Sequence, residues 1–259
     1  MKYLKKDTRI TLMRDLIRLF FVISFFVIYS ILGIDFVIEH NVVQWLSIVL
    51  LGTIFCGWAC PFGGASYFMS RIGNKLFPKL QFNLPAKIDK PLRYLRHVLL
   101  VYFLYIIIFS EGVDFVDCMT YFGKNTFTMA YLLIKFITVL LVSLFIPHFF
   151  CKYLCFQKAF YNIAAIIFRV TKITRNESTC ISCKKCDKVC PMSIEISKLK
   201  QVRANECLSC FNCLDKDVCP TKSKSLGFKW MGKTWNYVTF SLVAFVIYMA
   251  ITLSVIYVF

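Results

Sequence analysis

Two cysteine runs constrain the fold of this chain more than any other feature of its sequence. The first run is Cys180-Ile-Ser-Cys183-Lys-Lys-Cys186-Asp-Lys-Val-Cys190-Pro, and the second places Cys207, Cys210 and Cys213 at the same spacing before Cys219-Pro. Disulfide frameworks have no reason to prefer such tight runs. Closely spaced thiolates in a CxxCxxCxxxCP run are instead the ligand pattern of bacterial iron–sulfur clusters.

The spacing of the runs also predicts which cysteines act together. In a two-cluster run, three thiolates bind one [4Fe-4S] cluster and the fourth binds the other. Cluster one is therefore expected on Cys180, Cys183, Cys186 and Cys219, and cluster two on Cys207, Cys210, Cys213 and Cys190. Five residues separate Cys213 from Cys219 where three are usual, and we interpret this as a local bulge because the Cys-Pro pair is kept. Zinc is the alternative, but structural zinc sites use CxxC pairs rather than this run written twice.

Long apolar runs dominate the rest of the chain, which is 58% hydrophobic with a mean hydropathy of +0.65. A transmembrane helix needs about 20 mostly apolar residues. Five such runs lie at about Leu16–Ile38, Val42–Cys56, Leu92–Ser110, Phe127–Phe150 and Tyr237–Phe259. They predict a polytopic α-helical membrane protein, with about five transmembrane helices in two pseudo-repeated hairpins and a small α+β 2[4Fe-4S] ferredoxin-like domain.

The basic residues suggest an orientation for these spans. Of the 31 Lys and Arg residues, 29 fall in segments 1–18, 57–97 and 151–235, which the spans place on one side. Because cytoplasmic loops are enriched in Lys and Arg, we expect a multi-pass protein of the cytoplasmic membrane. Its N-terminus and cysteine runs would be cytoplasmic and its C-terminus extracytoplasmic. The net charge of +17 is then a matter of topology, and we expect no nucleic-acid partner.

Hydropathy also sets the expected domains. Residues 1–173 would form a membrane domain of two helical hairpins, residues 174–235 a polar ferredoxin-like domain, and residues 236–259 a C-terminal transmembrane helix. A domain of about 60 residues buries too little apolar surface to be stable alone, and clusters would supply the missing cross-links.

Four further cysteines repeat one pattern. Cys56-Gly-Trp-Ala-Cys60 closes the second span and Cys151-Lys-Tyr-Leu-Cys155 closes the fourth. Residues four apart share one face of a helix, so two such pairs could form a four-thiolate site. We predict a possible third iron–sulfur centre on Cys56, Cys60, Cys151 and Cys155. Ordinary or redox-active thiols and another metal are the alternatives.

Other cofactors and catalytic groups are not expected. His97 and His148 lie near the cytoplasmic ends of two predicted spans, where histidines are common, so haem is disfavoured. No hydrolytic triad, phosphate-binding glycine loop or intramembrane carboxylate pair is present. We expect no catalytic residue, and a subunit of an oxidoreductase complex rather than an enzyme acting alone.

Together these motifs resemble a known family. The segment Cys56-Gly-Trp-Ala-Cys60-Pro-Phe-Gly, the Cys151–Cys155 pair and the two ferredoxin runs are similar to the NapH-, NosR- and CcoG-like membrane polyferredoxins, over roughly residues 10–225. The resemblance implies electron transfer between a cytoplasmic donor or the quinone pool and a membrane or extracytoplasmic redox partner. It also leaves open an accessory role in assembling a metalloenzyme, or a membrane redox sensor.

A docking surface is expected on the polar domain. Segment 176–235 carries 11 Lys and Arg against 6 Asp and Glu. Such a surface would attract an acidic carrier such as a small ferredoxin or flavodoxin by electrostatic steering. Anionic lipid headgroups are the alternative partner for the same charges.

Overall fold

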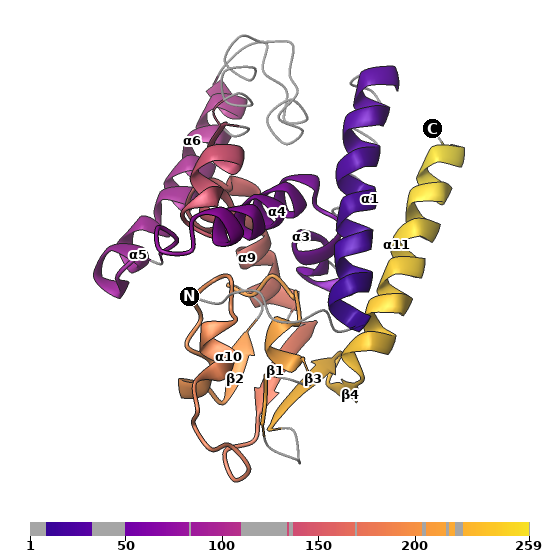
Figure 1. Cartoon of the computed structure of the whole chain (residues 1–259). Coiled ribbons are helices and arrows are strands. Elements are labelled where there is room, and N and C mark those ends of the chain that lie inside the picture. The colour runs from indigo at the N-terminus through magenta and orange to yellow at the C-terminus, as the bar shows by residue number, and fades with distance from the viewer. Residues whose placement is uncertain are drawn as a thin grey trace. The chain divides into compact units, whose positions relative to one another are not determined.

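The chain forms two compact units. The computed structural model describes residues 9–32, 50–82, 84–109, 134, 137–168, 170–203, 206–215, 218–220 and 225–258 (Figure 1). The first unit comprises residues 1–20, 43–60 and 162–259, and the second comprises residues 21–42 and 61–161. These units follow contacts in space, whereas the boundaries expected at residues 173 and 235 follow hydropathy and stay a prediction.

A four-stranded antiparallel sheet lies in the first unit, in the order β2-β1-β3-β4. The strands are β1 (Thr171–Arg175), β2 (Gln201–Arg203), β3 (Leu226–Trp230) and β4 (Lys233–Trp235). Ile173 pairs with Val202 on one side and with Phe228 on the other, and all three side chains are buried. Met231 and Gly232 join β3 to β4 with positive φ angles of 48° and 84°, as a two-residue hairpin turn requires. The sheet therefore presents one apolar face to a core.

That core is closed by the two helices at the ends of the described chain. Helix α1 (Arg9–Leu32) contributes Met13 and Ile17, and helix α11 (Tyr237–Val258) contributes Phe240 and Ala244, to one apolar cluster. In Figure 1 the N-terminal turns of α1, which belong to the first unit, lie beside the N-terminal turns of α11. The side chain of Asn236 accepts the Val238 N–H at 3.0 Å, which caps the start of α11.

The second unit is built mainly from helices. These are α4 (Pro61–Leu76), α5 (Ala86–Leu92), α6 (Leu95–Phe109), the 3₁₀ turn η1 (Val142–Leu144), the π-helix η2 (Phe150–Leu154) and the start of α9 (Phe156–Phe168). Helix α4 approaches η1 so closely that a Cβ on Gly73 would lie 2.0 Å from the Leu144 carbonyl oxygen. The Ser66 and Ser143 hydroxyls are 2.8 Å apart at the same contact. A side chain larger than hydrogen at residue 73 would separate these two segments.

The expectation of five transmembrane helices is wrong. Within the described residues, no helix combines the length and the apolarity needed to cross a membrane. Helix α6, in the third expected span, has 15 residues, against the roughly 20 that a span needs. In the described end of the fourth expected span the α-helix stops at residue 141, where η1 begins, and α1 carries Arg14, Asp15 and Arg18 in its first half.

Parts of all five expected spans lie outside the described residues. They are residues 33–38 of the first, 42–49 of the second, 110 of the third, 127–133 with 135–136 of the fourth and 259 of the fifth. The expected architecture of two transmembrane hairpins is therefore also wrong. The small α+β region expected around the cysteine runs is present. The cellular location inferred from those spans was a sequence-based prediction and stays one.

Candidate iron–sulfur centres

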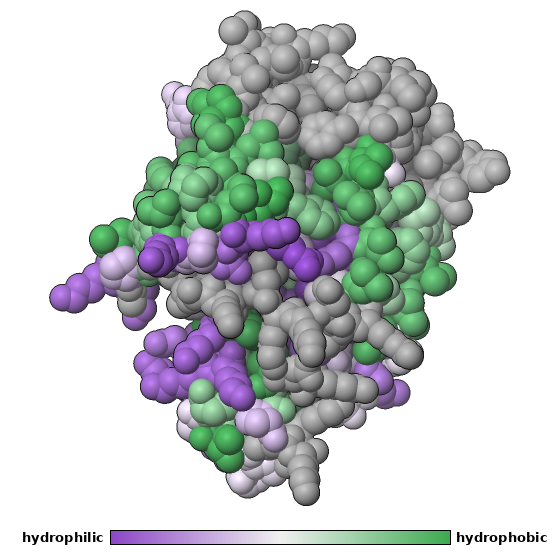
Figure 2. Space-filling model, viewed as in Figure 1, coloured by the Kyte–Doolittle hydropathy of each residue, from purple (hydrophilic) through white to green (hydrophobic). Residues whose placement is uncertain are grey.

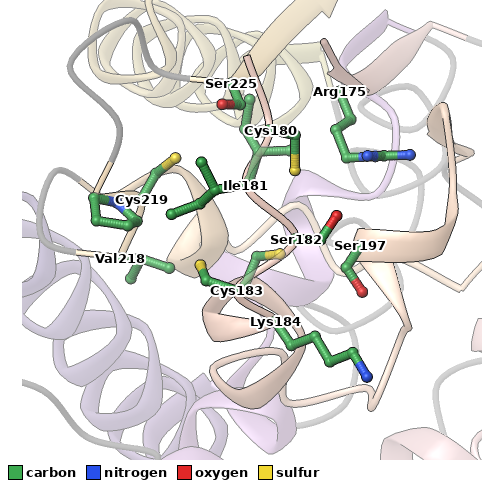
Figure 3. A pocket seen from close by; sticks show the side chains of 13 residues that line it. Arg175, Cys180, Ile181, Ser182, Cys183, Lys184, Ser197, Val218, Cys219 and Ser225 are labelled. Atoms are coloured by element: carbon green, nitrogen blue, oxygen red, sulfur yellow. The ribbon is translucent and has the colours of Figure 1, made fainter. Parts of the chain in front are cut away.

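The first candidate centre is a pocket of about 380 Å³ at the end of the sheet where β1 stops and β3 starts. Cys180, Cys183, Cys186 and Cys219 all line it. Figure 3 shows Cys180 and Cys183 on one continuous loop, while Cys219 enters from a separate segment beside Val218. The structure therefore brings together the four cysteines assigned to cluster one by their spacing, although the assignment itself stays a prediction.

The second candidate centre is a pocket of about 350 Å³. Cys190, Cys207, Cys210 and Cys213 all line it, together with apolar side chains such as Met192 and Ile196. Cys190 comes from the first run and the other three from the second run. The arrangement is the exchange of the fourth cysteine that the two-cluster pattern requires.

Both cysteine runs adopt the same unusual backbone conformation. Loop one (residues 180–186) has positive φ angles at Ser182 (51°) and Lys184 (56°), and loop two (residues 207–213) has them at Ser209 (50°) and Phe211 (58°). Each residue that is not glycine costs about 1–2 kcal/mol in this left-handed region. Alternation of right- and left-handed residues turns successive N–H groups inward and makes a concavity that binds anions, including iron–sulfur clusters.

Short helices complete the two loops. Helix α10 (Lys185–Lys188) follows Lys184, and the 3₁₀ turn η4 (Asn212–Leu214) follows Phe211. The 3₁₀ turn η3 (Ile196–Lys198) packs against α10. The Asn212 amide lies 3.5 Å from the Val189 carbonyl oxygen and donates to it, which joins loop two to the end of the first run.

The first sulfur of each run is held by a backbone amide. The Ser209 N–H donates to the Cys207 Sγ at 3.3 Å. In loop one, a hydrogen bond from the Ser182 backbone lowers the pKa of the Cys180 thiol, and Arg175 lowers it further. Donors aimed at sulfur stabilise the thiolate form that binds iron.

Two buried thiols disfavour ionisation. Burial, together with the neighbouring Cys210, raises the pKa of Cys190 to about 12. Burial and the neighbouring Cys207 and Cys210 also raise the pKa of Cys213. Several thiols that disfavour ionisation together would release protons when iron binds them, so that folding and cluster binding are coupled.

A cluster fits these pockets better than a single ion does. Within the described part of the chain, no group of three or more His, Cys, Asp or Glu side chains is placed to hold a metal ion. A single ion needs its donors close to one point, whereas a cubane takes one thiolate at each of its four irons. Four cysteines line each pocket, and in loop two the Ser209 N–H also points at a cysteine sulfur, which is an arrangement that suits a cubane.

The two candidate centres differ in exposure. Cys183 is exposed, and its neighbour Ile181 is 63% exposed. Cys190, Cys210 and Cys213 are all buried. An electron-transfer partner can therefore approach loop one more closely than loop two.

Loop two is held by a segment from far earlier in the chain. The short helix α3 (Ile54–Trp58) follows Thr53, whose hydroxyl donates to the Cys207 carbonyl oxygen at 2.9 Å. The Trp58 indole N–H donates to the Ser209 carbonyl oxygen at 3.0 Å. A Cβ on Gly57 would lie 2.3 Å from the Leu208 carbonyl oxygen, so the two backbones touch.

Two arginines of α1 complete this support. Arg14 donates to the Cys210 carbonyl oxygen at 2.8 Å and also to the Asn212 side-chain oxygen. Arg18 donates to the Gly57 carbonyl oxygen at 2.7 Å. Sequence reasoning missed these residues, which do not ligate a cluster. The available signal was a pair of arginines four residues apart interrupting an apolar run.

The two CxxxC pairs, Cys56 with Cys60 and Cys151 with Cys155, share one local conformation. The N–H of Cys60 donates to the Phe55 carbonyl oxygen, and the N–H of Cys155 donates to the Phe150 carbonyl oxygen, both at 2.9 Å. Each bond spans five residues and closes a Phe-Cys-x-x-x-Cys turn, after which α4 or α9 begins. Cys56 and Cys60 belong to the first unit, and Cys151 and Cys155 belong to the second. The third centre on all four cysteines stays a prediction.

Buried charges lie next to the second pair. Asp89 lies 3.5 Å from the Lys152 ammonium, accepts a 2.5 Å hydrogen bond from the Tyr153 hydroxyl and pairs with Arg93. These partners lower the pKa of Asp89, although its burial opposes them. The π-helix η2 that carries Lys152 and Tyr153 also carries Cys151, and π-turns are frequent at functional sites.

The two histidines considered for haem both lie in the second unit. His148 is buried, has a φ of 54° and contacts the ring of Tyr67, while His97 contacts the ring of Tyr94. The expectation that the chain binds no haem stays a prediction.

Comparison with protein families identifies the type of site. A 4Fe-4S binding domain family matches residues 42–79 and again residues 128–174, so each match contains one CxxxC pair. A 4Fe-4S dicluster domain family matches residues 172–220, which contain both cysteine runs. A protein of Methanocaldococcus jannaschii, MJ0750, is 34% identical over 190 residues, which are 71% of this chain and 75% of that protein.

The chain belongs to the NosR- and NapH-like polyferredoxin family of 4Fe-4S proteins.

Two further members of this polyferredoxin family show how the chain compares. YccM of Escherichia coli (strain K12), named for electron transport, is 36% identical over 191 residues, which are 68% of this chain and 51% of YccM. The chain thus spans about half the length of that relative. The regulatory protein NosR of Pseudomonas aeruginosa is 27% identical over 67% of this chain and 26% of NosR. No solved structure matches the chain. The family expected from the motifs is confirmed, as is its iron–sulfur and electron-transport character.

Proposed function

We propose that this polyferredoxin carries electrons through two [4Fe-4S] clusters in series, as a subunit of an oxidoreductase complex. The observation that carries the proposal is the pair of pockets, each lined by four cysteines in the exchanged arrangement. Clusters supply one-electron chemistry, while the protein sets their position, potential and access. The cluster on loop one, with the exposed Cys183, exchanges electrons with the external redox partner. The more buried cluster on loop two exchanges electrons with the cluster on loop one.

The charges around loop one support an acidic partner. Lys184, Lys185 and Lys188 are exposed beside Cys183, and Lys198 and Lys200 are exposed on the neighbouring η3–β2 segment. Figure 2 shows a hydrophilic patch over the position of α10 and β2 in Figure 1. We propose a small acidic ferredoxin or flavodoxin as the partner at this surface, and quinone or a second redox protein as the partner beyond loop two.

The decisive experiment is cofactor analysis of the anaerobically purified full chain. Two cubanes give about 8 iron and 8 sulfide per chain, and reduction should produce the EPR signals of two interacting [4Fe-4S]⁺ centres. A count of about 4, or protein that binds zinc without sulfide, would contradict the proposal. A third centre would raise the count to about 10–12 iron.

A further inference from the structure

The strongest unassigned feature is the buried guanidinium of Arg14 on the carbonyl of a predicted cluster ligand. Arg14 is 4% exposed, and its Nη1 lies 2.8 Å from the Cys210 carbonyl oxygen. It also donates to Asn212, which stands beside Cys213. A positive charge is thus fixed against the backbone of loop two, in surroundings that screen it poorly.

A second buried guanidinium lies close by. Arg18 is 3% exposed and binds the Gly57 carbonyl oxygen, on the segment that contacts Leu208 and Cys210. Arg14 and Arg18 each lie 3.9 Å from the same carboxylate oxygen, Asp15 Oδ1. Helix α1 thus places two positive side chains, Arg14 and Arg18, and one negative side chain, Asp15, near the candidate centre on loop two.

Loop one has a carboxylate beside one of its predicted ligands. Asp187 follows Cys186 directly, and its Oδ1 lies 3.6 Å from the Cys186 Sγ. Its carboxylate is fixed there by the Ser197 N–H at 2.8 Å and the Ser197 hydroxyl at 2.5 Å. The guanidinium at this centre, Arg175, donates a hydrogen bond to the Cys180 thiol, and the Glu177 carboxylate 3.3 Å away offsets its charge. The three lysines of loop one and α10 are exposed, so solvent and salt screen them.

The charge contrast predicts which centre is easier to reduce. Reduction adds one negative charge to a cluster, so a nearby cation raises the reduction potential and a nearby anion lowers it. Burial acts in the opposite sense, because a low-dielectric site disfavours the more highly charged reduced form. Loop two is the more buried loop, so without Arg14 it would hold the centre that is harder to reduce.

We infer that Arg14 reverses this order and makes the centre on loop two the electron-accepting end of the pair. This inference rests on the proposed function and adds the direction of transfer, from the exposed loop one inward to loop two. The step moves one electron, from the reduced centre on loop one to the oxidised centre on loop two. It breaks no bond and releases no proton. Arg14 is a positioning residue, since it acts on the cluster through the Cys210 backbone.

The test is a potentiometric titration of the anaerobic full chain, followed by EPR. Loss of one signal in Cys183→Ser or in Cys210→Ser assigns the two reduction steps. In the wild-type chain the step at higher potential should belong to the loop-two centre. Arg14→Gln, which keeps an amide donor but removes the charge, should move that step to lower potential and leave the other step in place. Arg14→Lys should keep most of the wild-type potential.

Asp187→Asn provides the matched variant at loop one. It should move only the loop-one step, to higher potential, and it remains informative if Arg14→Gln does not fold. The inference is overturned if the higher step belongs to loop one, or if Arg14→Gln with full iron leaves both steps unchanged. It is also overturned if Asp187→Asn moves neither step. Protein without reducible clusters would instead overturn the proposed function.

Discussion

The indole N–H of Trp58 donates a hydrogen bond of 3.0 Å to the carbonyl oxygen of Ser209, which lies 151 residues further along the chain. Ser209 sits between two predicted cluster ligands and has a φ of 50°. Trp58 lies between the two cysteines of the first CxxxC pair. The centroid of its ring is 6.2 Å from the centroid of the Phe211 ring. The CxxxC segment thus holds the backbone of loop two in its left-handed conformation.

Replacement of Trp58 by Phe tests this contact. The change leaves the Ser209 carbonyl without its indole donor, and a lost buried partner costs about 1–3 kcal/mol. We expect a lower thermal midpoint, faster loss of iron to a chelator and a changed EPR line shape for the loop-two centre. Trp230→Phe is the control, because it removes an indole bond of the same length to the Leu50 carbonyl oxygen, away from the cysteine loops. Equal iron loss from both variants would contradict the role of Trp58.

Gly57 gives a steric test of the same interface. A methyl group at residue 57 would meet the Leu208 carbonyl oxygen at 2.3 Å and the Cys210 backbone nitrogen at 3.2 Å, and neither backbone atom can move aside easily. Gly57→Ala should therefore destabilise the protein by about 2–3 kcal/mol and reduce occupancy of the loop-two centre. In Gly227→Ala the added methyl meets only the Thr174 side-chain oxygen, at 3.3 Å, and the effect should be well below that. Iron content and chemical denaturation of the two variants provide the comparison, and a Gly57→Ala protein with wild-type iron would argue against tight contact.

The grouping of the cysteines could be predicted from the sequence because cysteine spacing is local. The runs at Cys180 and Cys207 were sufficient to group eight cysteines into two sets of four, and the structure places those sets around two pockets. The support from Thr53 and Arg14 was not predictable, since these residues meet loop two only through long-range folding. Residue type alone does not reveal which backbone carbonyl a buried arginine will bind.

Hydropathy misled the fold prediction for a related reason. An apolar run looks the same whether its side chains face lipid or a protein core. Phe240 and Ala244 lie in the core beside Phe211, and the run that carries Arg14 and Arg18 contributes Met13 and Ile17 to the same core. The arginines within that run were counted as flanking charges for orientation, although they are buried donors.

Cysteine substitutions test the exchanged ligand sets. If Cys219 completes the loop-one centre, Cys219→Ser and Cys183→Ser should weaken the same EPR signal and lower the iron count from about 8 to about 4 per chain. Cys190→Ser and Cys210→Ser should do the same to the other signal. If each cluster instead used only the four cysteines of its own run, Cys190 would belong to the loop-one centre and Cys219 to the loop-two centre. If Cys190→Ser weakened the signal that Cys183→Ser weakens, the exchanged arrangement would be wrong.

Ionic strength tests the docking surface around loop one. Lys184, Lys185 and Lys188 are exposed beside the exposed Cys183, and electrostatic steering to such a surface weakens as salt screens it. The rate of electron exchange with an acidic ferredoxin or flavodoxin should fall when salt rises from about 50 to about 300 mM, where the Debye length falls by more than half. Lys184→Glu with Lys185→Glu should slow the exchange at low salt and flatten its salt dependence. Lys233→Glu, an exposed charge change on β4, should have a much smaller effect. A rate that ignores salt in the wild-type chain, or an equal loss in the β4 variant, would place the docking surface elsewhere.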